Sequence, residues 1–166
     1  MQVQNNIQHT SFKAIMVPKD CQRRFMTALR QECNAEQLLR CVQVLEKEKT
    51  NANHVIVRDM GYIAGNSCNG HLKATVNNKS YWNSDSLFSF PTIPQFLEKM
   101  SKKAGKYLDK PQKLARKAQD LLNKKEMIET KAMRKEHIAK GFVTEEENRH
   151  YLLGEVYKLI NYRPKN

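Results

Sequence analysis

The apolar residues near the start of the chain predict a short strand followed by a helix. Residues 12–17 are mostly apolar and stop at Pro18, which is typical of a strand that ends there. Beyond this proline, apolar residues recur every three or four positions. We therefore predict a helix that Asp20 caps and that runs to about Cys33.

A second helix is predicted directly after the first. Asn34 is a suitable N-cap, and Gln37, three residues later, completes a capping box. At helical spacing the expected buried positions are Leu38, Val42 and Leu45. One kinked helix across both segments is the alternative interpretation.

Between residues 53 and 83 the spacing changes to the alternation that is typical of strands. Four segments share this alternation: 54–58, 62–64, 72–76 and 79–82. Gly and Asn residues at 65–70 predict a loop, and Asn77-Asn78 predicts a two-residue hairpin turn. Together the segments predict a small antiparallel meander.

Helical spacing returns at residue 92, where Thr92 and Gln95 form a second capping box. The helix that follows has a predicted buried stripe: Phe96, Leu97, Met100, Ala104, Tyr107 and Leu108. A long helix is predicted over 112–139, with Gly141 ending it in a left-handed conformation.

The last predicted helix begins after Thr144, which forms a third capping box with Glu147. Its expected buried residues are Leu153, Val156, Tyr157 and Ile160.

This order of elements favours an α+β fold. It consists of a small antiparallel sheet, formed by the N-terminal strand and the meander, with two helices, followed by three C-terminal helices. We divide the chain into a polar flexible arm (1–10), an α+β region (11–90) and a basic helical region (91–166). We expect the last two regions to pack as a single domain.

Composition limits the class of protein. The chain has 166 residues, 40% of them hydrophobic, and its mean hydropathy is -0.73, which fits one water-exposed domain. The longest apolar run is short of the roughly 20 residues that a membrane-spanning helix needs, so we predict no transmembrane segment. The N-terminus lacks the features of a Sec-type signal peptide. We expect a cytoplasmic location and leave secretion by a non-Sec route open.

Positive charge is concentrated in one part of the chain. Residues 95–140 carry 14 Lys and Arg against 6 Asp and Glu, which is +8 of the formal net charge of +12. At about 100° per residue, most of these cations fall on one side of two predicted helices. The candidate binding residues are Lys99, Lys102, Lys103, Lys106, Lys113, Arg116, Lys117, Lys124, Lys131, Arg134 and Lys135.

The basic arc of the long helix excludes most of its apolar residues. These lie on the other side: Leu114, Ala118, Leu121, Leu122, Ile128 and Ala132. Met127 and Ile138 are exceptions, because they fall within the basic arc and favour contact of that arc with a partner protein or with the rest of the fold.

A row of like charges favours binding of a polyanion, because phosphate contacts release counterions. We therefore predict a non-catalytic protein that binds nucleic acid through phosphates. Lysines outnumber arginines in the row, and a lysine supplies a point charge rather than the bidentate hydrogen bonds with which arginine recognises bases, so little sequence specificity is expected.

The alternative is a protein-interaction module, such as a secreted effector or phage-type factor, with a solvated basic face. An acidic protein or an anionic membrane surface would be its partner. The sequence does not determine the oligomeric state.

Candidate chemistry outside this region is sparse. Cys68 and His71 are separated by two residues, but no catalytic motif surrounds them, and an incidental cysteine in a turn is the simpler interpretation. The four cysteines have neither zinc-ligand nor disulfide-framework spacing. We predict no catalytic residue, no metal ligand and no cofactor.

One resemblance suggests a third function. The order of strand, two helices and meander over residues 12–83, in a small basic chain, resembles the RelE/ParE toxins, which include ribosome-dependent ribonucleases. The resemblance implies four sheet-borne candidates for general acid–base catalysis: Arg58, His71, Lys73 and Tyr81.

Overall fold

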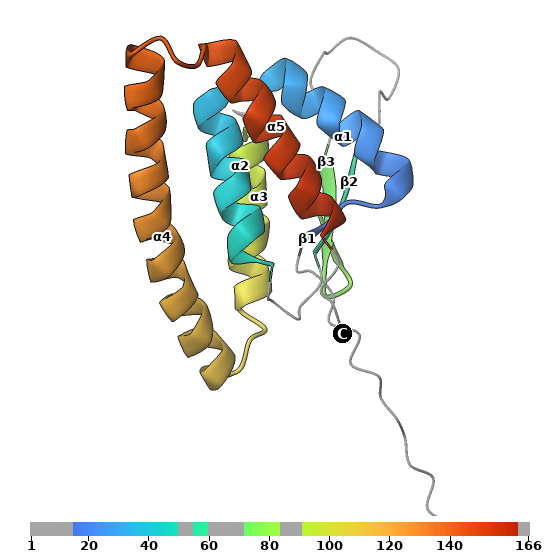
Figure 1. Ribbon diagram of the computed structural model, residues 1–166. Coiled ribbons are helices and arrows are strands. Elements are labelled where there is room, and N and C mark those ends of the chain that lie inside the picture. The colour runs from blue at the N-terminus through green and yellow to red at the C-terminus, as the bar shows by residue number, and fades with distance from the viewer. Residues whose placement is uncertain (1–14, 50–54, 60–71, 84–90, 163–166) are drawn as a thin grey trace, which may run out of the picture.

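The computed structural model describes residues 15–49, 55–59, 72–83 and 91–162. Their elements are β1 (Ile15–Met16), α1 (Lys19–Glu32), α2 (Ala35–Lys47), β2 (Val55–Asp59), β3 (Leu72–Val76), β4 (Lys79–Trp82), α3 (Ile93–Gly105), α4 (Lys110–Ala139) and α5 (Glu145–Asn161). The predicted α+β class is confirmed, and the first two helices are separate (Figure 1).

The sheet has the strand order β1-β2-β3-β4. β2, β3 and β4 form the predicted antiparallel meander, and Asn77 and Asn78 have positive φ angles (48° and 65°), as a two-residue hairpin turn requires. β1 instead runs parallel to β2, with Ile15 opposite Val55. The sheet is therefore mixed, because α1 and α2 carry the chain back to the end from which β1 started. The predicted strand 62–64 and loop 65–70 lie outside the described residues.

Capping residues in the sequence predicted the first residues of most helices correctly. The capping boxes predicted at Asn34, Thr92 and Thr144 are present, and Asp109 forms a further one with Gln112. The helix predicted to run to about Cys33 is present as α1, but its predicted N-cap, Asp20, was wrong. Its N-cap is Pro18, whose carbonyl accepts hydrogen bonds from the N–H groups of Cys21 and Gln22, while the Asp20 carboxylate lies within the first turn near the positive helix end.

The boundary between α3 and α4 also differs from the prediction. α3 ends at Gly105, so Lys106 and Tyr107 lie beyond it, and α4 begins at Lys110. At the other end of α4, Gly141 has a φ of 71°, which confirms the predicted left-handed cap.

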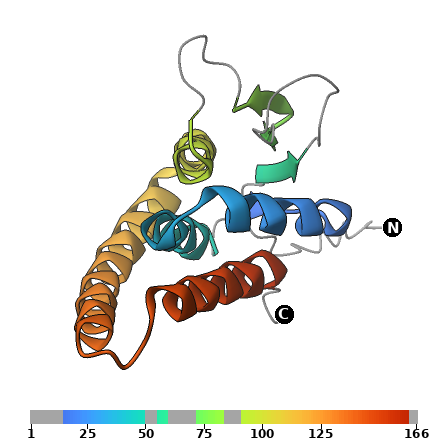
Figure 2. The same ribbon diagram turned by 90° about the horizontal axis from the view of Figure 1, so that it is seen from above.

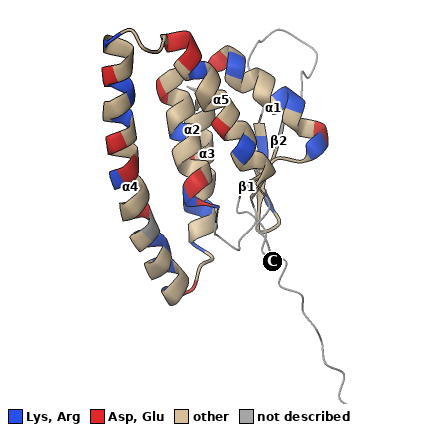
Figure 3. Ribbon diagram, viewed as in Figure 1, with Lys and Arg blue, Asp and Glu red and all other residues tan. Residues whose placement is uncertain are grey.

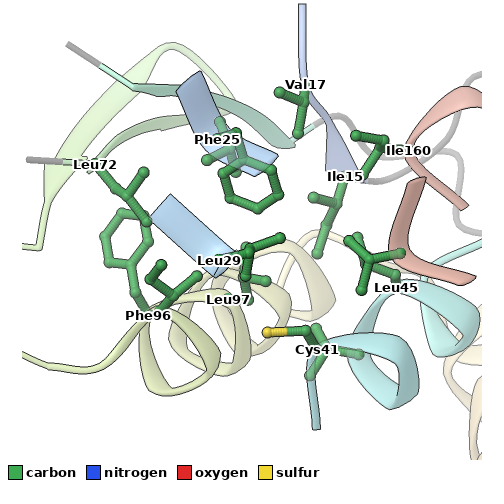
Figure 4. Packing of buried hydrophobic residues seen from close by; sticks show 14 of the residues in the cluster. Ile15, Val17, Phe25, Leu29, Cys41, Leu45, Leu72, Phe96, Leu97 and Ile160 are labelled. Carbon is green, nitrogen blue, oxygen red and sulfur yellow. The ribbon is translucent and has the colours of Figure 1, made fainter. Parts of the chain in front are cut away.

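The core lies between the sheet and the helices. Phe25 and Leu29 from α1 meet Phe96 and Leu97 from α3 close to Leu72 of the sheet (Figure 4). Residues of α5, such as Val156, belong to the same cluster, so the two halves of the chain share one core.

Three predicted core positions need correction. Tyr107 is 44% exposed, because it lies beyond the end of α3 and not on its buried stripe. Tyr157 on α5 is 53% exposed, since a phenol ring at the edge of a helix stripe can keep its hydroxyl in water. Val42 is only partly buried against the core.

α2 is the central helix, in contact with α3, α4 and α5. α4 lies at the edge of the molecule, with the other helices all to one side of it (Figures 1 and 2).

The C-terminal end of α1 is capped by a residue that is distant in the sequence. Arg149 of α5 donates hydrogen bonds to the carbonyl oxygens of Arg30 and Cys33, which the end of α1 leaves without helical partners.

Candidate nucleic-acid interface

α4 contacts the rest of the molecule through the side that carries the predicted basic arc. Its partly buried residues recur at intervals of three or four: Arg116, Asp120, Asn123, Met127, Thr130, Arg134 and Ile138. We call this set the inner seam of α4. Met127 packs against the core, which confirms the expectation that it marks contact between the basic arc and the fold.

Arg116 forms the most buried contact of this seam. Its guanidinium is ion-paired with Glu48 at the end of α2, whose side chain is fully buried, and also donates to the hydroxyl of Ser101 on α3 at 2.9 Å. The Ser101 hydroxyl in turn donates to the Glu48 carboxylate. Gly105 leaves the space for this arrangement, since a Cβ there would collide with the Arg116 guanidinium. Arg116 is therefore a structural cation that joins three helices.

Further polar contacts continue along α4. Lys47 of α2 is paired with Asp120 at 2.6 Å, and Lys131 lies 3.6 Å from Glu36 in an exposed pair. Arg134 donates to the amide oxygen of Asn148 at 3.1 Å and lies over the ring of Tyr151, 4.1 Å from its centroid. On α3, Lys103 lies over Tyr81 at 4.9 Å.

The other predicted cations face solvent. Seven of them are exposed and have no ion pair with the described part of the chain: Lys99, Lys102, Lys106, Lys113, Lys117, Lys124 and Lys135. We call this set the lysine surface. Most of it lies near the connection between α3 and α4, where lysines from both helices are brought close together along the chain. Figure 3 shows basic segments along α4.

A basic groove between α1 and α5 was missed by the sequence interpretation. It has a volume of about 750 Å³, and its cationic lining comes from Lys19, Arg23 and Arg30 on α1, with His150 and Tyr157 on the α5 side. The pairing of α1 with α5 is a tertiary contact across more than a hundred residues. The only local signal is the spacing of Arg23 and Arg30, which are seven residues apart and so lie on one side of α1.

Of the four residues suggested by the RelE/ParE resemblance, Arg58 is opposite Lys73 in the β2–β3 register, whereas Lys73 and Tyr81 lie on opposite faces of the sheet. Lys73 is paired with Trp82 in the β3–β4 register and lies over its ring, whereas Tyr81 is paired with Ala74 on the core side of the sheet. Because neighbouring residues of a strand point to opposite faces, Lys73 and Tyr81 cannot act on one substrate atom. His71 and Cys68 lie outside the described residues.

Two thiols are close together inside the fold. Cys33 and Cys41 are both buried. A hydrogen bond between them lowers the pKa of Cys33 and raises the pKa of Cys41 well above its usual value, and burial raises the pKa of Cys41 further.

Within the described ranges, no group of His, Cys, Asp or Glu side chains is arranged to hold a metal ion. No helix in the same part of the chain is long and apolar enough to cross a membrane.

Comparison of the chain with protein-family models, with curated protein sequences and with solved structures found no match in any of the three.

Proposed function

We propose that this protein is a non-catalytic, polyanion-binding protein that binds nucleic acid through phosphate contacts of its lysine surface. The observation that supports the proposal is a charge imbalance. Seven lysines of α3, α4 and their connection face solvent without an ion pair in the described residues, while Arg116 and Arg134 are occupied by contacts within the fold.

The physical reason is that such a surface is less stable alone than beside a polyanion. Like charges one helical turn apart repel each other by about 0.2–0.5 kcal/mol per pair at low salt. A phosphate backbone removes this repulsion and releases its own counterions. Lysine ammonium groups neutralise phosphates without reading base edges, so binding would depend strongly on salt and weakly on sequence.

The test is fluorescence anisotropy of labelled single- and double-stranded DNA and RNA over a salt range of about 50 to 300 mM, in which phosphate contacts weaken steeply. We expect log affinity to fall linearly with log salt. The variant Lys102→Glu/Lys106→Glu/Lys113→Glu/Lys117→Glu should lose most of the affinity and about three to four units of the salt slope on double-stranded DNA. It spares Arg116 and Arg134, and an unchanged circular dichroism melt would verify its fold. Absence of binding at the lowest salt would reject the proposal.

A protein-interaction module is the second candidate, because α4 also exposes large aliphatic side chains. Leu114, Leu121 and Ile128 are 66–69% exposed on the side of α4 that faces away from the molecule. Exposed apolar patches of this kind mark association surfaces more often than isolated exposed residues do. An acidic protein would be the partner that the net charge of +12 favours over long distances.

A further inference from the structure

We propose that the outward side of α4 is a self-association surface on which a second copy of the chain packs its own α4 in parallel. This inference does not depend on nucleic-acid binding. It starts from three large aliphatic side chains on one side of α4, each 66–69% exposed: Leu114, Leu121 and Ile128. We call this side the outer face of α4.

The outer face lies opposite the inner seam. At about 100° per residue, the directions of Leu114 and Leu121 differ from those of Asn123 and Arg134 by roughly 140–180°. The rest of the molecule is on the seam side, and α4 forms the edge of the fold in two perpendicular views (Figures 1 and 2). A second helix can therefore approach the outer face along the 30 residues of α4, about 45 Å, without meeting the other helices.

The spacing of the outer face is that of a coiled-coil seam. Leu114, Leu121 and Ile128 repeat every seven residues. A second series with the same repeat begins four residues after the first: Ala118, Lys125, Ala132 and Ala139. Alternating steps of four and three residues keep one stripe facing a partner helix, and small alanines beside large aliphatics allow the two backbones to approach closely.

The residues that flank this stripe on its two sides, its borders, carry charges that indicate which partner packs on the outer face. One border carries only lysine in its first four repeats: Lys110, Lys117, Lys124 and Lys131. The opposite border carries Glu129 and Glu136 in its later repeats. In a parallel pair of identical helices each border faces the other border of the partner, so Lys124, which has no ion pair in the described residues, meets the partner's Glu129. Lys131 would face the partner's Glu136 in the same way, but within the chain Lys131 is paired with Glu36 at 3.6 Å and Glu136 with Lys140 at 2.5 Å.

The alternative arrangement of two copies is disfavoured by the same charges. In an antiparallel pair each border faces its own equivalent, which would place the lysine border against the lysine border of the partner subunit and the two glutamates against theirs. Like charges across such a seam destabilise it. The borders are thus complementary to a second copy in one orientation only.

Two lysines interrupt the stripe: Lys135, which follows Ile128 by seven residues, and Lys125. A lysine in a seam fixes register at a cost in stability, and Lys125, between Leu121 and Ile128, supplies the sharper test. Replacing it by leucine should therefore tighten the dimer, whereas a surface with no role in association would not respond to this change.

The first experiment is sedimentation equilibrium of the full chain, freed of nucleic acid, over protein concentrations from about 1 to 300 µM, the range for a moderately stable association. We expect a monomer–dimer equilibrium in the wild type. Lys125→Leu should lower the dissociation constant about tenfold or more, and Leu121→Lys/Ile128→Lys should abolish the dimer. Both changed residues of the second variant are exposed, so its thermal melt should remain close to that of wild type. A wild type and a Lys125→Leu variant that both stay monomeric over the whole range would overturn the proposal.

The orientation is tested by exchanging one pair of border charges. Glu129→Lys alone and Lys124→Glu alone should each weaken the dimer roughly fivefold, and the double variant Lys124→Glu/Glu129→Lys should restore it, because the two residues face each other across a parallel seam. Failure of the double variant to restore association would overturn the parallel arrangement. Because these measurements contain no nucleic acid, they succeed or fail independently of the anisotropy experiment.

Discussion

The positive charge of Arg116 stabilises the packing of α4 against α2 and α3. Its side chain is 14% exposed, and its guanidinium neutralises Glu48, whose side chain has no exposure at all. Replacing Arg116 by alanine would leave that carboxylate buried beside the Ser101 hydroxyl without its cation. Removing one partner of a buried ion pair destabilises the fold far more than replacing both partners by apolar residues.

We therefore predict that Arg116→Ala lowers the free energy of unfolding by about 3 kcal/mol, measured by urea denaturation. Lys117→Ala is the matched control, because Lys117 is the adjacent residue and is exposed without a described ion pair; its effect should stay within about 0.5 kcal/mol. The double variant Glu48→Leu/Arg116→Met should recover much of the loss. Equal effects of Arg116→Ala and Lys117→Ala would contradict a structural role for Arg116.

At the scale of helices, the start of α5 contains a carboxylate whose hydrogen bonds are made only in the folded chain. The backbone N–H and the hydroxyl of Thr144 both donate to Glu147 at 2.8 Å, which holds the pKa of Glu147 below its ordinary value of 4.5. A lowered folded pKa means that this cap contributes stability above the unfolded pKa and loses that contribution as pH falls through the folded pKa.

The expected result is a pH-dependent difference between wild type and Glu147→Gln. The urea midpoint of the wild type should exceed that of the variant at pH 7, and the two midpoints should converge as pH falls below about 4.5. Glu146→Gln is the control: Glu146 is in the same first turn, but the capping-box partner of Thr144 is Glu147. A difference between wild type and Glu147→Gln that persists unchanged to pH 3 would contradict this account.

The helix starts could be predicted because their causes are local. Asn34, Thr92 and Thr144 each need only a residue three positions on. The side on which α4 docks could not be predicted in the same way. A stripe of leucines normally turns toward the core, but here the polar inner seam turns inward, because its partners Glu48 and Asn148 come from other helices. Met127 and Ile138, the two apolar residues within the basic arc, were the local indications of the true orientation.

At the scale of the whole molecule, the residues that the structure describes form two basic surfaces rather than one. The lysine surface belongs to α3 and α4, whereas Lys19, Arg23 and Arg30 line the groove between α1 and α5. α1 and α4 lie on different sides of the molecule, and Figure 3 shows basic residues on both. Net charge alone attracts a polyanion to either surface, so a loss of binding after charge reversal is informative only if the change in net charge is held constant.

Two variants meet this condition. Lys102→Glu/Lys106→Glu/Lys113→Glu and Lys19→Glu/Arg23→Glu/Arg30→Glu both lower the formal net charge from +12 to +6. If the lysine surface contacts phosphates directly, its variant should lower affinity for double-stranded DNA at least tenfold more than the groove variant does, and only its salt slope should fall by about two to three units. Equal losses would mean that binding follows the overall field of the protein. A larger loss from the groove variant would move the interface to α1 and α5, where Tyr157 is available to stack on a base.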